Sequence, residues 1–147
     1  MNKFIESSKK ERELMLTIFN KHNITDYSFT DEYSSLRYDG IFNKESKGTT
    51  RKIVFEVKNR KIDSNRYRTT VIEKSKYEFL IEFAKENDAE PFIFIFFTDG
   101  TYLAENLNKC NVTFSKKYCP KTTDGNNSMI EKELCEILIT KENIYKL

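Results

Sequence analysis

The feature that most constrains this 147-residue chain is one uninterrupted apolar run, PFIFIFF, over Pro91 to Phe97. A membrane-spanning helix needs roughly 18 apolar residues, so this run is too short to cross a bilayer. Its length and its richness in Phe and Ile are typical of a buried strand. Asp99-Gly100 follows and predicts a tight turn into a shorter strand over 101–107.

The rest of the chain predicts a mixed sheet flanked by helices. Residues 6–22 predict a helix, capped by Ser7 or Ser8. A second helix is expected to begin at Thr69 or Thr70, with Glu73 completing a capping box, and to end near Asn87. The fold class is therefore α/β (α+β), with core order α-β-β-α-β-β, in a single domain spanning residues 1–147.

Strands are expected over 35–42 and 51–58, joined by a polar loop over 43–50. A basic loop over 59–68 separates the second of these strands from the second helix. Residues 107–128 are expected to be rich in loops, and residues 129–140 fit either a helix or an edge strand.

Composition excludes several classes of function. The N-terminal residues MNKFIESSKKERE lack the apolar segment of a signal peptide, so we expect a cytoplasmic protein without a membrane partner. The chain has one histidine, His22, and three cysteines without a CxxC pair, which excludes multi-histidine metal sites and predicts free thiols. It also lacks a glycine-rich phosphate loop, so we expect no nucleotide cofactor.

The net charge of +2 conceals a strong asymmetry along the chain. Residues 44–76 carry a net charge of +7, and residues 77–106 carry −6. A basic block of this kind is a candidate phosphate-binding surface. An ordinary charged exterior is the alternative that charge alone leaves open.

The strand over 51–58 places charged groups beside apolar ones. Side chains alternate along a strand, so Glu56 and Lys58 share one face, and Phe55 and Val57 share the other. A hairpin would bring Asp39 next to Glu56. Two carboxylates and a lysine suit metal-assisted hydrolysis of a phosphodiester. The alternative is a surface strand with an ordinary Glu–Lys pair.

Each predicted helix carries a charge within its apolar stripe. Glu11 lies on the same side as Leu14 and Ile18, whereas Glu13 lies opposite. Lys76 falls inside the stripe of the second helix. Buried charges need partners, so both side chains are expected to face the charged end of the sheet. They could instead extend past the edge of the stripe to reach water.

These residues resemble known nucleases. Asp39 followed by Glu56-Val57-Lys58 resembles the signature of the PD-(D/E)xK nuclease superfamily, whose core is α-β-β-β-α-β, although Tyr38 stands where that signature has proline. The run from Glu11 to Leu14 resembles the first helix of archaeal-type Holliday junction resolvases. The stretches FEVKNR and IEKSKYEFL resemble small phage-encoded endonucleases.

The resemblance, which covers residues 9–106, implies a DNA endonuclease that uses one or two Mg²⁺ or Mn²⁺ ions per active site. It implies Asp39, Glu56 and the Val57 carbonyl as metal ligands, Glu11 as a ligand of a second metal or through water, and Lys58 as the catalytic lysine. It also implies phosphate contacts from Arg60, Arg66, Arg68 and Lys76.

The implied substrate is DNA, in branched form for a resolvase, and the implied assembly is a homodimer. Three alternatives stay open: a nuclease of the same fold that acts on linear or nicked DNA, a non-catalytic DNA-binding module, and a general interaction protein with a charged surface. Tyr67 could stack on a base or pack within the protein.

Overall fold

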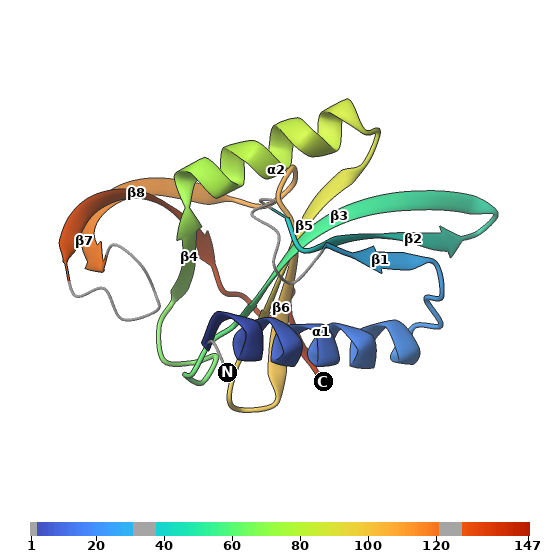
Figure 1. Ribbon diagram of the computed structural model, residues 1–147, viewed down its shortest axis with the longest axis horizontal. Helices are drawn as coiled ribbons and strands as arrows, with labels where there is room; N and C mark the ends of the chain where they lie inside the picture. The colour runs from blue at the N-terminus through green and yellow to red at the C-terminus, as the bar shows by residue number, and fades with distance from the viewer. Residues whose placement is uncertain (1–2, 31–37, 121–127) are drawn as a thin grey trace.

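The computed structural model of the chain describes residues 3–30, 38–120 and 128–147 (Figure 1). In these ranges the chain forms two helices and nine strands. In order they are α1 (Lys3–Lys21), β1 (Tyr27–Phe29), β2 (Gly40–Ser46), β3 (Thr49–Asn59), β4 (Thr69–Glu73), α2 (Lys74–Glu86), β5 (Glu90–Phe96), β6 (Thr101–Asn106), β7 (Val112–Pro120), β8 (Met129–Leu138) and β9 (Ile144–Lys146).

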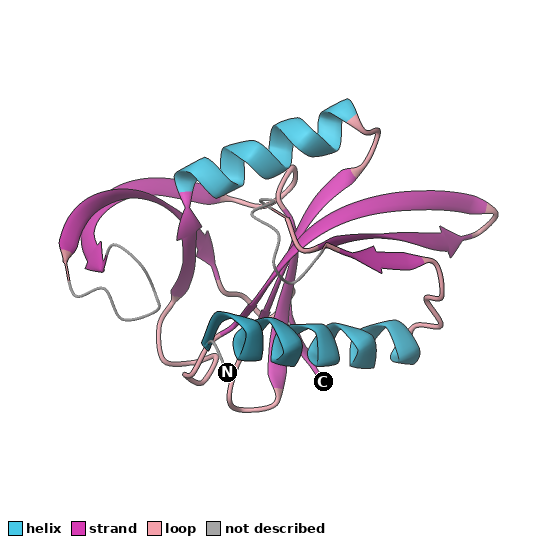
Figure 2. Ribbon diagram, in the orientation of Figure 1, coloured by secondary structure: helices cyan, strands magenta, loops and turns pink. Residues whose placement is uncertain are grey.

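Six strands form a mixed central sheet in the order β1-β2-β3-β5-β6-β9. β3 and β5 lie at its centre and run parallel, whereas the other neighbouring pairs are antiparallel. Figure 2 shows the strands crossing between the two helices, with α2 above the sheet and α1 below it. The predicted mixed sheet flanked by helices, with the apolar run as β5, is confirmed.

Each helix packs its apolar stripe on one face of the central sheet. Met15 and Phe19 of α1 join a cluster that includes Phe55 and Phe94 of the sheet. On the other face, α2 contributes Leu80 to a cluster formed with Ile93, Ile95 and Leu103 of the sheet. The central strands are therefore buried on both faces, as the apolar run over Pro91 to Phe97 predicts.

A second sheet, β4-β8-β7, curls away from the first (left side of Figure 1); it corrects two predictions and decides a third that was left open. Residues Thr69 to Glu73 form strand β4 rather than the first turn of a helix, and α2 begins only at Lys74. Within the region 107–128, Val112–Pro120 form strand β7 rather than loop, and residues 121–127 fall outside the described residues. Of the two alternatives for residues 129–140, the strand is confirmed as β8, but it lies in the middle of this sheet rather than at its edge. The β-branched residues of TTVIE favour a strand once β8 pairs with them.

Two further predictions need correction. The expected polar loop over 43–50 is mostly strand, because β2 and β3 meet at a turn of Lys47 and Gly48 with φ of 52° and 77°. Positive φ at both central residues is the geometry of a type I′ hairpin. Ser7 and Ser8 lie inside α1 rather than capping it. Part of the strand expected over 35–42 falls outside the described residues.

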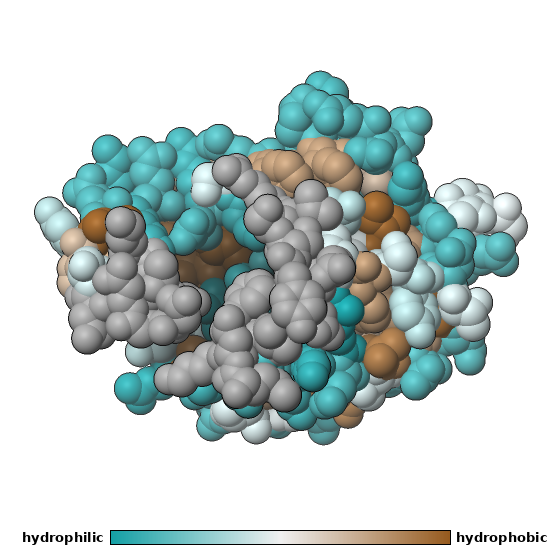
Figure 3. Space-filling model, viewed as in Figure 1, coloured by the Kyte–Doolittle hydropathy of each residue, from teal (hydrophilic) through white to brown (hydrophobic). Residues whose placement is uncertain are grey.

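The front surface is mostly polar. Figure 3 shows hydrophilic residues at both ends of the top edge, where α2 lies, a hydrophobic stretch along the middle of α2, and smaller hydrophobic patches at the right below that helix. Within the described ranges, neither helix is both long enough and apolar enough to span a bilayer.

Of the glycines in the described residues, Gly40 leaves the least room for a side chain. A Cβ atom there would lie 2.5 Å from the Ser28 carbonyl oxygen and 2.6 Å from Cζ of Phe55. We expect Gly40→Ala to lower the free energy of unfolding by about 1–3 kcal/mol, because β1 would have to move away from β2. Urea denaturation measures this. Ser46→Ala, at an exposed position of the same strand, is the control. Equal stability of both variants would contradict the packing described here.

Candidate active site

Asp39 lies immediately before β2 and is held against β3 by its backbone and its side chain. Its N–H donates to the Phe55 carbonyl (2.8 Å), and its Oδ2 accepts from the Val57 N–H (2.7 Å). The preceding residue, Tyr38, stacks its ring on Phe83 of α2 at 4.6 Å between centroids. Tyr38, which stands where the signature has proline, therefore anchors the Asp39 segment to α2.

Glu56 is buried on the α2 face of β3, and its two carboxylate oxygens each contact a lysine. Lys58 Nζ lies 3.2 Å from Oε1, and Lys76 Nζ of α2 lies 3.3 Å from Oε2. The Glu56 residue is only 3% exposed. A buried carboxylate is costly unless it is paired, and these two cations pair it. The structure thus places Glu56, Lys58 and Lys76 together, as strand alternation and the helix stripe predict.

Glu11 reaches the same place from α1. Its carboxylate lies within electrostatic range of Lys58 and Glu56, and the Asn59 backbone N–H acts to lower the pKa of Glu11. Glu11 is half-buried, whereas Glu13 is exposed, as the helical periodicity predicts. The contribution of the Asn59 N–H was not predicted, because a backbone donor leaves no pattern in side-chain types.

The clustering of carboxyl groups perturbs their ionisation. Burial raises the pKa of Asp39 to about 8, and the charges of Glu56 and Glu11 act in the same direction. Burial also raises the pKa of Glu11 to about 7, although Lys58 opposes the shift. Burial alone would lower the pKa of Lys58, but Glu56, Glu11 and Asp39 together raise it above its ordinary value. Groups perturbed in this way are typical of functional sites.

The donor set fits a hard divalent cation. The charge of Glu56 acts directly on the Asp39 carboxyl group, so the two carboxyl groups lie near each other. Backbone groups of one residue point to the same side of a strand, so the Val57 carbonyl faces the side on which Asp39 binds the Val57 N–H. In the described ranges, no group of three His, Cys, Asp or Glu side chains is arranged to hold a metal. Mg²⁺ commonly uses one or two carboxylates and several waters, which Asp39 and Glu56 match.

The basic residues that follow β3 differ in their surroundings. Arg60 is half-buried, and its Nη2 donates to the Val71 carbonyl at 2.7 Å. Burial lowers the pKa of Arg60, while Glu11 and Glu56 oppose the shift. Arg66 and Arg68 are exposed on the loop that leads to β4. Only these two of the three arginines present their side chains openly to a ligand.

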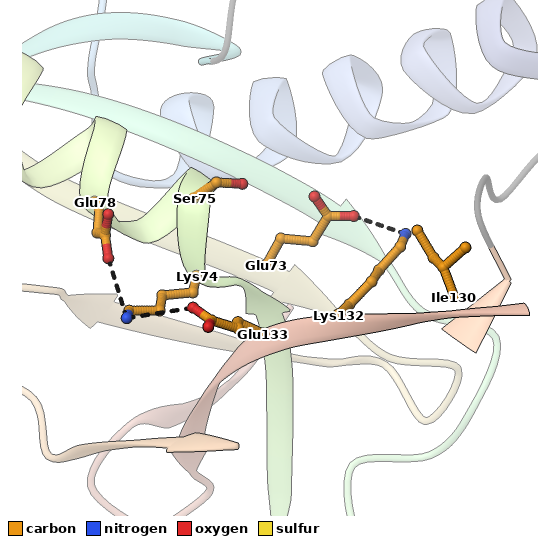
Figure 4. Close-up of a pocket in the computed structure, with 7 residues that line it drawn as sticks. All are labelled: Glu73, Lys74, Ser75, Glu78, Ile130, Lys132 and Glu133. Atoms are coloured by element: carbon orange, nitrogen blue, oxygen red, sulfur yellow. Dashed lines mark hydrogen bonds and ion pairs between the residues drawn. The ribbon is translucent and has the colours of Figure 1, made fainter. Parts of the chain in front are cut away.

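A separate pocket of about 470 Å³ lies where α2 begins beside β8 (Figure 4). Its charged groups pair with one another: Lys132 with Glu73 at 2.9 Å, and Lys74 with Glu133 at 3.4 Å. The residues that line it are Glu73, Lys74, Ser75, Glu78, Ile130, Lys132 and Glu133. Since none of the clustered carboxylates described above lines this pocket, we place the candidate site at the end of β3.

The raised pKa values predict how stability depends on pH when metal is removed. A carboxyl group whose pKa is raised by folding favours the folded state while it is protonated, and this contribution is lost as pH rises through the folded-state pKa. In EDTA we therefore expect the free energy of unfolding to fall between pH 6.5 and 8.0, by more than about 1 kcal/mol. Urea denaturation at a series of pH values measures it.

Between pH 6.5 and 8.0, the change in stability should come from the carboxyl groups rather than from the histidine or the cysteines. Partial burial lowers the pKa of His22, so titration of this histidine affects the free energy of unfolding only at lower pH. Burial raises the pKa values of Cys110 and Cys135 to about 11 and 12, so their effect lies at higher pH. Asp39→Asn should flatten the dependence. Wild-type stability in EDTA that is constant or rises across this range would contradict the carboxyl cluster.

Comparisons with known proteins connect this geometry to a fold. No protein-family model matches the chain, and no curated protein matches it. The structure is similar to that of Hjc, a Holliday junction resolvase from the archaeal hyperthermophile Archaeoglobus fulgidus. The TM-score is 0.54, the aligned parts cover 85% of each chain, and the sequence identity is 12%. The two proteins share a fold, a central mixed sheet flanked by helices of the restriction-endonuclease-like type.

Proposed function

We propose that this protein is a divalent-metal-dependent endonuclease that hydrolyses phosphodiester bonds in DNA. The observation that carries the proposal is the convergence of Asp39, Glu56 and Lys58 at one end of β3, with Glu11 arriving from α1. The signature that resembles PD-(D/E)xK nucleases thus coincides with a cluster whose ionisation is perturbed. The similarity to a resolvase fold agrees with the proposal.

In the proposed reaction each side chain has a distinct role. Asp39 and Glu56, with the Val57 carbonyl, would hold Mg²⁺ or Mn²⁺, and Glu11 would act through water or a second ion. The bound metal supplies positive charge that polarises the phosphate and lowers the pKa of a bound water. Lys58 keeps its proton, because its pKa is raised, and so can orient the attacking water or stabilise charge on the phosphate.

Lys76 has a role that differs from the phosphate contact expected from the sequence. Its ammonium group contacts Glu56 at 3.3 Å, so it fixes the orientation of that carboxylate in the metal-free protein. A second lysine at Glu56 also balances its charge when no metal is bound. The proposal therefore treats Lys76 first as a partner of Glu56 and only second as a DNA contact.

The neighbouring fold indicates which DNA to test first. The Archaeoglobus fulgidus protein is a Holliday junction resolvase, so a four-way junction is the leading substrate, and linear and nicked duplexes are the alternatives. A junction has two-fold symmetry, so the proposal includes a homodimer that places two sites on opposed strands. Light scattering at micromolar concentration tests the dimer: a monomer that still makes paired cuts would contradict it.

Removing one carboxylate charge tests the chemistry. We expect Glu56→Gln to slow cleavage by at least about 100-fold, because Gln retains the shape and one oxygen but not the charge that a metal needs. DNA binding should change little. The assay is nicking of supercoiled plasmid and cutting of a four-way junction with Mg²⁺, with Mn²⁺ and with EDTA.

Two glutamates of α1 provide a matched control. Glu11→Gln should also reduce cleavage, whereas Glu13→Gln makes the same change on the exposed side of the helix and should not. Undiminished cleavage by Glu56→Gln, or full wild-type activity in excess EDTA, would overturn the nuclease assignment. DNA binding without any cleavage would favour a non-catalytic module.

The exposed arginines predict how DNA binding depends on salt. Arg66→Ala with Arg68→Ala should weaken binding and reduce the slope of log affinity against log salt by about 0.9 for each lost phosphate contact. Lys85→Ala with Lys141→Ala removes the same charge from exposed positions outside the basic block and is the control. If both double variants lower affinity equally, the basic block is not the DNA-binding face.

A further inference from the structure

The loop between β3 and β4, residues 60–68, is closed at its base. The Arg60 guanidinium, at the start of the loop, donates to the carbonyl of Val71, just beyond its end (2.7 Å). The Thr98 N–H donates to the Ile62 carbonyl at 2.9 Å, which ties the loop to the end of β5. Loops whose ends lie this close form compact surface units that frequently carry function.

The middle of the loop is braced against the turn between β5 and β6. The backbone N–H and the hydroxyl of Ser64 both donate to Oδ2 of Asp99, at 3.1 and 2.6 Å. The Thr98 hydroxyl donates to Asp63, and the Arg66 N–H donates to the Asp63 carbonyl at 3.1 Å. A ligand that binds the loop therefore meets a largely preformed surface, which lowers the entropic cost of binding.

This braced loop displays an aromatic ring. Tyr67 is 59% exposed, and the ring contact that the structure gives it is from the guanidinium of Arg66, 5.6 Å from the ring centroid. Three other exposed aromatics of the described residues contact rings: Tyr27 stacks on Phe19, Tyr145 stacks on Tyr102, and Phe114 meets Tyr77 edge to face. The sequence leaves open whether Tyr67 stacks on a base or packs within the protein. In the structure its ring is exposed and does not pack in the core.

The loop also borders the candidate active site. It begins directly after the strand that carries Glu56 and Lys58, and Arg60 at its base lies within electrostatic range of Glu11 and Glu56. In Figure 1 it lies at the lower left, between β3 and β4. Exposed Arg66 and Arg68 flank Tyr67, so a nucleic acid backbone and a base would both find partners on this loop.

We infer that Tyr67 stacks on a DNA base that is exposed by a gap, flap or branch point, so that the loop recognises DNA with an unstacked base. The inference rests on the proposed function for DNA as the ligand, and it adds which DNA structure is preferred. A base inside an intact duplex is already stacked on both faces and cannot offer one to the ring. Tyr67, on a loop beside the carboxylate cluster, would thus favour DNA with an exposed base whatever its base sequence.

The test compares two DNAs of the same sequence, an intact duplex and a duplex with a short single-stranded gap, each labelled with fluorescein and bound in Ca²⁺. Tyr67→Ala should weaken binding to the gapped DNA by about 10- to 100-fold and binding to the intact duplex by less than about 2-fold. Tyr67→Phe should bind like wild type, because stacking uses the ring. With 2-aminopurine in the gap, wild type should change its fluorescence and Tyr67→Ala should not.

Tyr118→Ala is the control, because Tyr118 is 72% exposed on β7, outside the loop. Equal weakening on both DNAs, no weakening on either, or the same loss from Tyr118→Ala would overturn the inference. Its failure can be told apart from failure of the proposed function. Cleavage that continues with no effect of Tyr67→Ala defeats only the inference, whereas selective binding without any cleavage defeats only the nuclease proposal.

Discussion

The carboxylate of Glu56, buried between β3 and α2, is the group around which the site is organised. Burial would make its charge costly without partners, and the ammonium groups of Lys58 and Lys76 supply them at 3.2 and 3.3 Å. Lys58 comes from the same strand, but Lys76 comes from α2, so the ion pairs depend on correct docking of the helix. The packing of α2 through Leu80 is therefore coupled to the geometry of the charged cluster.

The clustered carboxylates that the proposed function needs also destabilise the folded protein. Asp39, Glu56 and Glu11 repel one another when ionised. Burial raises the pKa values of Asp39 and Glu11 to about 8 and 7, and the charge of Glu56 acts on both in the same direction. The two large apolar clusters on the faces of the sheet stabilise the fold against this repulsion. A bound cation would remove the repulsion, so metal binding and folding stability should be linked.

Much of the fold could be predicted, because the strongest signals are local and periodic. Alternation along RKIVFEVK placed Glu56 on one face of β3, and helical periodicity separated Glu11 from Glu13. The errors arose where pairing between distant segments decides the structure. Thr69 to Glu73 imitate a helix cap, yet they form β4 because β8 pairs with them from more than sixty residues away. β7 is polar and mostly exposed, so its own composition does not distinguish it from a loop.

The clustering of the candidate site residues could be predicted, but their contacts could be predicted only in part. The spacing of Asp39, Glu56 and Lys58 identified the cluster, but it did not reveal that Arg60 is used to close a loop or that Lys76 holds Glu56. Both facts depend on where β4 and α2 begin, and this boundary was predicted wrongly from the sequence. The hairpin turn at Lys47 and Gly48 was missed for a related reason, since its positive φ values are favoured only once the flanking strands pair.

The central claim is that the carboxylates at the end of β3 form a divalent-metal site. Crystals grown with Mn²⁺ test it most directly, because anomalous scattering locates that ion without reference to activity. The account predicts an anomalous peak between Asp39 and Glu56, beside the Val57 carbonyl, and loss of that peak in Glu56→Gln. Mn²⁺ bound elsewhere, or no peak here at a concentration that supports cleavage, would contradict it.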